Sequence, residues 1–217
     1  MKIVLVVPLI GLLVCSPLHA GGFIVGGSYG IATGGEDAAS FNNELRDQGL
    51  DIPEGEGATT SGDIRTAWQA YVTYQFFSSW GVELAYVDLG EATVDFGGID
   101  EPIDAIFDVI GDIHPRSAQG VKLSATYRVE LNKNLQLQSK LGVFSWETEY
   151  FFSGVTPPPA NKLLTRAINL SGTDVSLGLG LVHKLTNNVA AHLDWDFYSI
   201  DGEVVNLFTF GASYKFE

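Results

Sequence analysis

The sequence has little cysteine: a single one, Cys15, among 217 residues. This scarcity excludes a disulfide framework and every zinc site that is built from several cysteines. Basic residues are also few, because 12 lysines and arginines stand against 26 aspartates and glutamates, for a net charge of −14. Nucleic-acid binding depends on dense lysine and arginine, so the charge balance argues against a nucleic-acid partner.

Long hydrophobic runs are absent beyond residue 20, where none reaches the roughly 18 residues that a membrane-spanning helix requires. The chain is nevertheless 46% hydrophobic, with 25 glycines and 12% aromatic residues. This composition excludes a disordered chain. It favours a β protein that is rich in glycine and aromatic residues.

Residues 1–20 have the layout of a secretory signal peptide. Lys2 is followed by the apolar stretch Ile3–Val14 and then by small residues that end at Ala20. This order is typical of a segment that directs export and is then removed. We therefore predict Sec-dependent export with cleavage after Ala20, which leaves residues 21–217 as one mature domain.

Cys15 raises the alternative of a lipoprotein, in which an acylated cysteine anchors the mature chain. The residue before it is Val14, whereas lipoprotein signals usually carry glycine, alanine or serine there. The simpler interpretation is that the cysteine leaves with the signal peptide, so the mature chain contains no thiol.

Beyond the signal peptide, apolar residues alternate with a period of two, as β-strands require. The expected strands, most of them 9 to 13 residues long, are 22–33, 65–77, 81–89, 120–129, 135–145, 174–183, 189–198 and 207–216. Soluble strands average about 5–6 residues, and strands that cross a bilayer have about 9–11. The lengths therefore favour a membrane barrel.

The two faces of these strands differ in charge. One face carries apolar and aromatic residues such as Val25, Leu123 and Leu179, and its only charged residue is Asp88 at a strand end. The other face carries Arg65, Glu83, Lys122, Arg128, Lys140, Asp174, Asp194, Asp196 and Lys215. A charge that faces lipid at mid-membrane costs roughly 2–4 kcal/mol, so we expect the polar face to line the interior.

Aromatic residues gather near the predicted strand ends, as in the interfacial belts of membrane barrels. Ordinary aromatic pairing within a sheet is the alternative explanation. We expect one belt from Tyr74, Phe76, Tyr127, Tyr214 and Phe216, and the other from Trp68, Tyr86, Phe197 and Phe208.

The connections alternate between short and long. Residues 78–80, 131–134 and 185–188 are expected tight turns, and 34–64, 90–119 and 146–173 are expected long connections, with a shorter one at 199–202. An even number of strands with this alternation places both termini on the side of the tight turns, the periplasm.

The first two long connections are strongly acidic. Residues 34–64 contain eight carboxylates and Arg46 as the only cation, and 99–110 could form a short amphipathic helix. Divalent-cation capture beside phosphorylated lipid is one interpretation. A solvated, self-repelling surface is the simpler one, and no EF-hand spacing is present.

Four segments together resemble the OmpA-like outer-membrane β-barrel family, over most of the mature chain and in the order of that family's strands. They are GVELAYVDLGEA (81–92), LQSKLGVFSWE (137–147), SGTDVSLGLGLVHKLTNN (171–188) and VNLFTFGASYKF (205–216). The resemblance implies an all-β, eight-stranded, antiparallel up-and-down transmembrane barrel in the outer membrane of a Gram-negative cell. Many family members carry a peptidoglycan-binding domain after the barrel, and we expect none here.

The resemblance also implies site residues. An interior ion-pair network is expected from Glu83, Lys122, Lys140, Asp194, Arg65 and Arg128. The ending Gly211, Tyr214 and Phe216 resembles the C-terminal signal read by the barrel assembly machinery, although Glu217 follows the usual terminal phenylalanine. Expected partners are outer-membrane lipid, lipopolysaccharide, that machinery, and an extracellular ligand or host surface through the loops.

An eight-stranded barrel is just wide enough to be filled by its own side chains, so we expect a plugged lumen with a structural or surface-interaction role. A narrow ion or small-solute channel is the alternative. An OmpW-like transporter would need an apolar lumen, which the charged inner face argues against.

A barrel enzyme that modifies lipid A is the third alternative. Its best candidate constellation is His192, Asp194 and Asp196. Three alternate residues span about 13–14 Å along a strand and cannot converge on one metal ion. We therefore expect no enzyme activity, no metal and no cofactor.

Overall fold

The computed structural model describes residues 21–35, 38–47, 49, 57–61, 64–91, 93–97, 117–155 and 163–216. The predicted signal peptide and the predicted helix at 99–110 lie outside these residues. Ten strands and a helix, α1 (Ala38–Asp47), lie within them. No helix in this part of the chain is long and apolar enough to cross a membrane.

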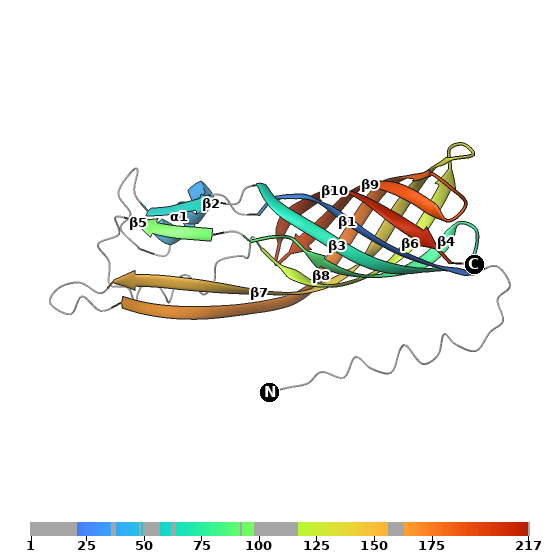
Figure 1. The fold of residues 1–217 in the computed structure, drawn as a ribbon. Helices are drawn as coiled ribbons and strands as arrows, with labels where there is room; N and C mark the ends of the chain where they lie inside the picture. The colour runs from blue at the N-terminus through green and yellow to red at the C-terminus, as the bar shows by residue number, and fades with distance from the viewer. Residues whose placement is uncertain are drawn as a thin grey trace, which may run out of the picture.

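Eight strands form a closed antiparallel barrel in the order β1-β10-β9-β8-β7-β6-β4-β3 (Figure 1). They are β1 (Gly22–Gly34), β3 (Ile64–Gln75), β4 (Trp80–Asp88), β6 (Gln119–Glu130), β7 (Leu135–Val155), β8 (Leu163–Lys184), β9 (Val189–Ile200) and β10 (Glu203–Lys215). β1 pairs with both β3 and β10, which closes the sheet. The predicted fold class is confirmed.

The two ends of the barrel differ. The turns at 77–79, 131–134 and 185–188 lie at one end, which we call the turn end. In Figure 1 the C-terminus lies there too, and the opposite end carries α1 and the two-stranded sheet of β2 (Gly57–Ser61) and β5 (Thr93–Gly97). We call this opposite end the loop end.

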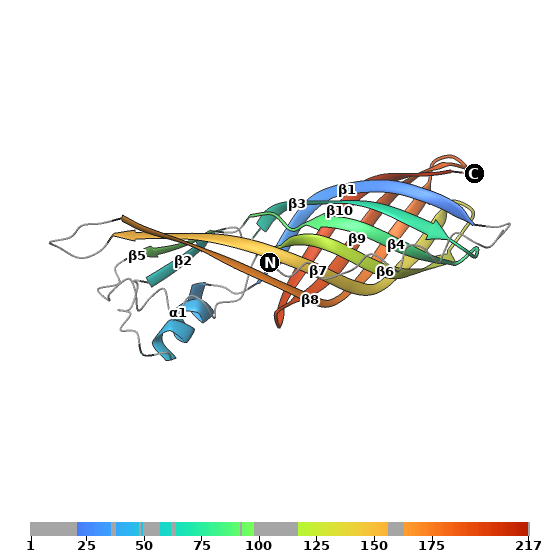
Figure 2. The same ribbon diagram turned by 90° about the horizontal axis from the view of Figure 1, so that it is seen from below.

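The third long connection was predicted wrongly. β7 and β8 continue through most of 146–173 and pair in one register from Leu135↔His183 to Val155↔Leu163. Figure 2 shows this two-stranded ribbon reaching well beyond the barrel. At about 3.3 Å per residue, the ten residues of β7 after Ser145 add roughly 33 Å.

The connection predicted at 199–202 is a tight two-residue turn. Asp201 and Gly202 both have positive φ, 51° and 89°. Positive φ at both central residues is the requirement of a type I′ hairpin, for which Asp-Gly is a favoured pair. This hairpin therefore joins β9 to β10 with almost no loop.

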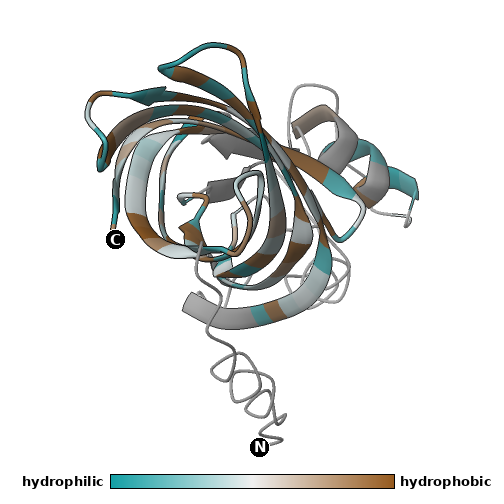
Figure 3. Cartoon of the chain, turned by 90° about the vertical axis from the view of Figure 1, so that its right-hand side faces the viewer, coloured by the Kyte–Doolittle hydropathy of each residue, from teal (hydrophilic) through white to brown (hydrophobic). Residues whose placement is uncertain are grey.

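Burial alternates along the barrel strands, as in the pattern of exposed and buried residues along β3. Outward apolar side chains are exposed, with Tyr29 at 63% and Leu141 at 59%, whereas Lys122 is 1% exposed. Figure 3 looks along the barrel and shows the alternating hydropathy of its wall. This is the reverse of a soluble barrel, and such an outer surface requires hydrocarbon around it.

Outward aromatic side chains pair across neighbouring strands near both ends. At the turn end, ring centroids lie 5.1 Å apart for Phe23 and Tyr74 and 4.7 Å apart for Trp80 and Tyr127. Toward the loop end, Trp68 and Tyr86 lie 5.6 Å apart. Such pairs serve both as cross-strand contacts and as interfacial belts, so the two explanations are compatible.

Candidate functional site in the barrel interior

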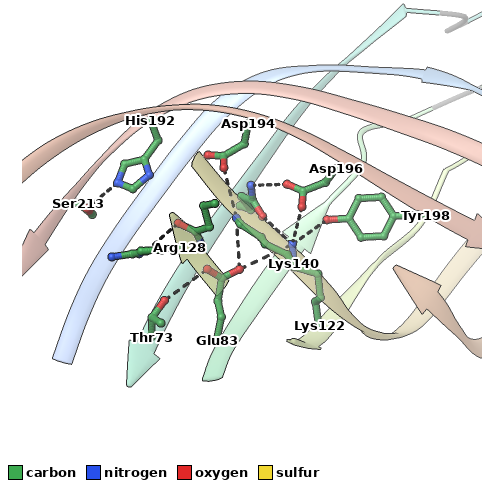
Figure 4. Close-up of polar contacts among 12 residues, drawn as sticks. Thr73, Glu83, Lys122, Arg128, Lys140, His192, Asp194, Asp196, Tyr198 and Ser213 are labelled. Carbon is green, nitrogen blue, oxygen red and sulfur yellow. Dashed lines mark hydrogen bonds and ion pairs between the residues drawn. The ribbon is translucent and has the colours of Figure 1, made fainter. Parts of the chain in front are cut away.

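Five charged side chains meet in the middle of the barrel, and we call them the charge cluster: Glu83, Lys122, Lys140, Asp194 and Asp196 (Figure 4). They come from β4, β6, β7 and β9, each at an inward position of its strand. None is more than 6% exposed. The cluster therefore lies in the interior of the barrel, where it is shielded from solvent.

The cluster contains two lysines and three carboxylates. Lys140 Nζ lies 3.4 Å from both Glu83 Oε1 and Asp194 Oδ1. Lys122 Nζ lies 3.2 Å from Asp196 Oδ1 and 3.8 Å from Glu83 Oε1. Glu83 thus lies between the two ammonium groups and joins the pairs into one network.

Neutral side chains surround the charges. Gln69 donates to Asp196 Oδ2 at 3.1 Å, and Thr73 donates to Glu83 Oε2 at 3.3 Å. Lys122 also donates to Tyr198 Oη at 3.3 Å. These bonds, with the ion pairs, offset the cost of removing the charges from water.

The structure brings together four of the six residues predicted for the network: Glu83, Lys122, Lys140 and Asp194. Arg65 lies toward the loop end, where it donates to the carbonyl oxygens of Leu89 and Gly34 at 3.1 and 3.0 Å. Arg128 lies toward the turn end and donates to Gln138 Oε1 at 3.1 Å.

Asp196 belongs to the cluster but was not predicted as a member. Opposite it on β8 stands Gly178, and opposite Asp194 stands Gly180. A Cβ atom at either glycine would collide with the facing carboxylate oxygen. The alternation of leucine and glycine in SLGLGL was therefore a signal that both aspartates point inward.

The half of the lumen toward the loop end is filled mainly by apolar side chains, which the comparison of faces by charge did not predict. A packed layer there contains Ala32, Ala67, Tyr71, Ala85, Val87, Leu89, Ala118, Phe144, Trp146, Tyr198, Ile200, Val205 and Leu207. Every member is at most 4% exposed. We call this set the apolar layer.

Two charged residues expected on the inner face lie at opposite rims of the barrel, where solvent reaches them. Asp174 is half-buried and accepts a hydrogen bond from Trp146 Nε1 at 2.7 Å. Lys215 is exposed at the end of β10. A position near a rim of the barrel can reach solvent even when it is on the inner face, and the period of two carries no information about its depth in the barrel.

The residues of the predicted assembly signal lie on β10 and just after it. Gly211 pairs with Ser28 of β1, and the Phe216 amide donates to the Phe23 carbonyl at 2.7 Å. Tyr214 and Phe216 are 47% and 50% exposed, with ring centroids 4.9 Å apart. Both rings are thus accessible at the turn end.

His192, Asp194 and Asp196 have separate partners. His192 Nε2 and Ser213 Oγ share a hydrogen bond of 2.6 Å, whereas the aspartates pair with different lysines. Among the described residues, no group of three histidine, cysteine, aspartate or glutamate side chains is arranged to hold a metal ion.

Comparison with known proteins gives a family and a set of similar folds. The family model of the OmpA-like transmembrane domain matches residues 22–216. No curated protein matches the chain. One similar structure is that of Ail, the attachment invasion locus protein of Yersinia pestis, in complex with the heparin analogue sucrose octasulfate. The two chains share 14% sequence identity with a TM-score of 0.50, and the match covers 91% of this chain and 99% of Ail. Another is the outer membrane protein OprG of Pseudomonas aeruginosa, which is 15% identical with a TM-score of 0.50. That match covers 91% of this chain and 97% of OprG.

Proposed function

The chain belongs to the OmpA-like transmembrane domain family, and on that premise we propose that it is a closed outer-membrane barrel with a structural and surface-interaction role. Its exposed apolar face contacts outer-membrane lipid and lipopolysaccharide. The turn end faces the periplasm, and the loop end faces outward. In this proposal Gly211, Tyr214 and Phe216 are read by the barrel assembly machinery.

The observation that carries the closed state is that two different barriers fill the lumen in succession. The charge cluster occupies the middle, and the apolar layer occupies the half toward the loop end. An ion on this path would have to separate buried ion pairs and then pass between packed apolar side chains. Removing one partner of a buried pair costs about 3–5 kcal/mol, so a small thermal fluctuation does not open such a path.

Planar-bilayer recording tests the closed state. The purified barrel, inserted into a bilayer, is expected to give no stepwise current, whereas a porin of about sixteen strands gives large steps under the same conditions. Insertion is verified by heat-modifiable gel migration of the same sample. Reproducible unitary steps that are absent from protein-free bilayers would instead establish the narrow-channel alternative.

The surface role rests on the long β7–β8 ribbon, which extends beyond the barrel. Its outer part lies beyond Thr148↔Leu170, and the strands stay paired there as far as Val155↔Leu163. Ail was solved with a polyanion. The acidic connections of this chain favour a cationic or cation-bridged partner instead, because like charges repel.

Shortening the ribbon separates anchoring from surface interaction. Replacing residues 149–169 by Asn-Gly leaves Thr148 and Leu170 paired beside a two-residue turn. We expect this variant to keep heat-modifiable migration and the wild-type melting temperature, while cells that display it adhere less to cultured epithelial cells. Unchanged adhesion would contradict the role of the ribbon, and loss of the folded band would show that the ribbon supports the barrel.

We propose no catalytic role. The acidic and imidazole groups on the inner face of β9 are engaged with Lys122, Lys140 and Ser213 rather than with one another. A lipid A mass that stays unchanged when the protein is expressed agrees with this proposal.

A further inference from the structure

The turn end of the barrel contains a cavity of about 330 Å³, which we call the vestibule. Its walls are the ends of the barrel strands and the turn at 185–188. None of the five residues of the charge cluster lines it. The vestibule is therefore lined by residues other than those of the charge cluster. Its volume is about ten times the volume that a water molecule occupies in the liquid.

The vestibule is basic although the chain is acidic. Its lining includes three cations, Arg128, Lys184 and Lys215, and Glu130 as its anion, whereas the whole chain carries −14. Glu130 is already engaged, because Lys184 Nζ and Gln136 Nε2 lie 3.3 and 3.4 Å from its Oε1. This leaves positive charge at Arg128 and Lys215 without a carboxylate partner among the described residues.

Arg128 is the buried member of this set. It is 9% exposed, and its Nε donates to Gln138 Oε1 at 3.1 Å. Its Nη2 is buried and has no hydrogen-bond partner among the described residues. Figure 4 shows Arg128 on the side of His192 and Ser213, away from the Lys122–Asp196 pair. A buried charged donor without a hydrogen-bond partner is costly, and other atoms of the Arg128 side chain line the vestibule.

We propose that the vestibule binds a small oxyanion, with a phosphate group as the best match. The planar guanidinium presents several N–H donors in a fork that fits two oxygens of one anion. Lys215 provides a second charge, and Ser213 is also among the lining residues. The volume accommodates a single hydrated phosphate group, supplied either as the free ion or by a lipid headgroup.

Titration of the full barrel in maltoside micelles with inorganic phosphate tests the proposal. We expect saturable binding by calorimetry with a dissociation constant of about 1 mM or lower. Arg128→Gln is expected to weaken binding roughly tenfold or more, because it removes a charged hydrogen bond. Lys133→Gln is the matched control, since Lys133 lies in an exposed turn at the same end and does not line the vestibule. Its affinity is expected to stay at the wild-type value.

Two further variants keep the test decisive if Arg128→Gln does not fold. Lys215→Gln, at an exposed position, is expected to weaken binding, and Glu130→Gln is expected to strengthen it by removing the anion of the lining. A structural role alone would not make these two variants shift the affinity in opposite directions. The absence of saturable binding, or equal binding by wild type and the Arg128 and Lys215 variants, would overturn the proposal and leave a water-filled vestibule.

The source of the phosphate is resolved by a second titration with short-chain phosphatidic acid below its micelle concentration. Tighter binding than inorganic phosphate, with the same dependence on Arg128, identifies a lipid headgroup. Equal or weaker binding identifies the free ion. Because the vestibule and the charge cluster share no residue, this result is independent of the conductance measurement.

Discussion

Replacing Lys140 by alanine is expected to lower the free energy of unfolding by about 3–5 kcal/mol, because it leaves buried carboxylates without their partner. Both oxygens of Asp194 are buried and accept no hydrogen bond from the described residues, so Lys140, 3.4 Å away, provides their compensation. Of its two lysine partners, Glu83 keeps only the more distant one, Lys122, at 3.8 Å, besides the hydrogen bond from Thr73. Urea unfolding in phospholipid vesicles, followed by tryptophan fluorescence, measures the change.

Two controls isolate the ion pair. Lys133→Ala removes the same side chain from an exposed turn and is expected to leave the unfolding midpoint unchanged. Lys140→Ala combined with Asp194→Asn removes the uncompensated charge and is expected to recover part of the loss, by about 0.5–3 kcal/mol. If Lys140→Ala unfolds at the wild-type urea concentration, the charge cluster contributes nothing to stability.

Replacing Phe144 by alanine is expected to cost a similar amount, about 3–5 kcal/mol, for a different reason. Phe144 is fully buried in the apolar layer, and its ring centroid lies 4.9 Å from that of Tyr198. Removing the ring leaves a cavity that the closed wall of strands cannot collapse around. The same vesicle unfolding experiment measures the effect, and a current in planar bilayers would show whether the cavity admits ions.

The matched control uses the same residue type on the other face. Phe210 is 67% exposed on the outer surface, where hydrocarbon replaces the lost contacts, so Phe210→Ala is expected to cost less than half as much as Phe144→Ala. Equal losses at the two positions would mean that the apolar layer is not a packed core.

The barrel was predictable because its strongest constraint is local. A period of two with charge confined to one face identified the wall, and the inward phase of Glu83, Lys122, Lys140 and Asp194 followed from it directly. The hydrogen-bond and ion-pair partner of each inward residue was harder to predict, because it depends on the register between strands. Gln69 and Asp196, 127 residues apart in the chain, are hydrogen-bonded through a register that no local pattern records.

The apolar layer and the ribbon were not predicted, for two different reasons. Inward residues such as Phe144 and Ile200 are apolar, so a comparison of faces based on charge passed over them. The ribbon was missed because the expected strand length came from the thickness of a bilayer, and pairing can continue in water where the sequence permits it. The short connection expected at 199–202 does contain the observed turn, Asp201-Gly202, but the strands on both sides extend further than expected.

The pairing of the first barrel strand with the last has a consequence for biogenesis. Residues 24–34 find their partners at 205–215, so the seam joins segments separated by most of the polypeptide. Until β10 arrives, β1 and β9 each present a bare edge that can recruit another chain. Closure therefore carries the entropy cost of bringing together two segments from opposite ends of the domain, and a chain truncated before residue 203 lacks the strand that closes the sheet.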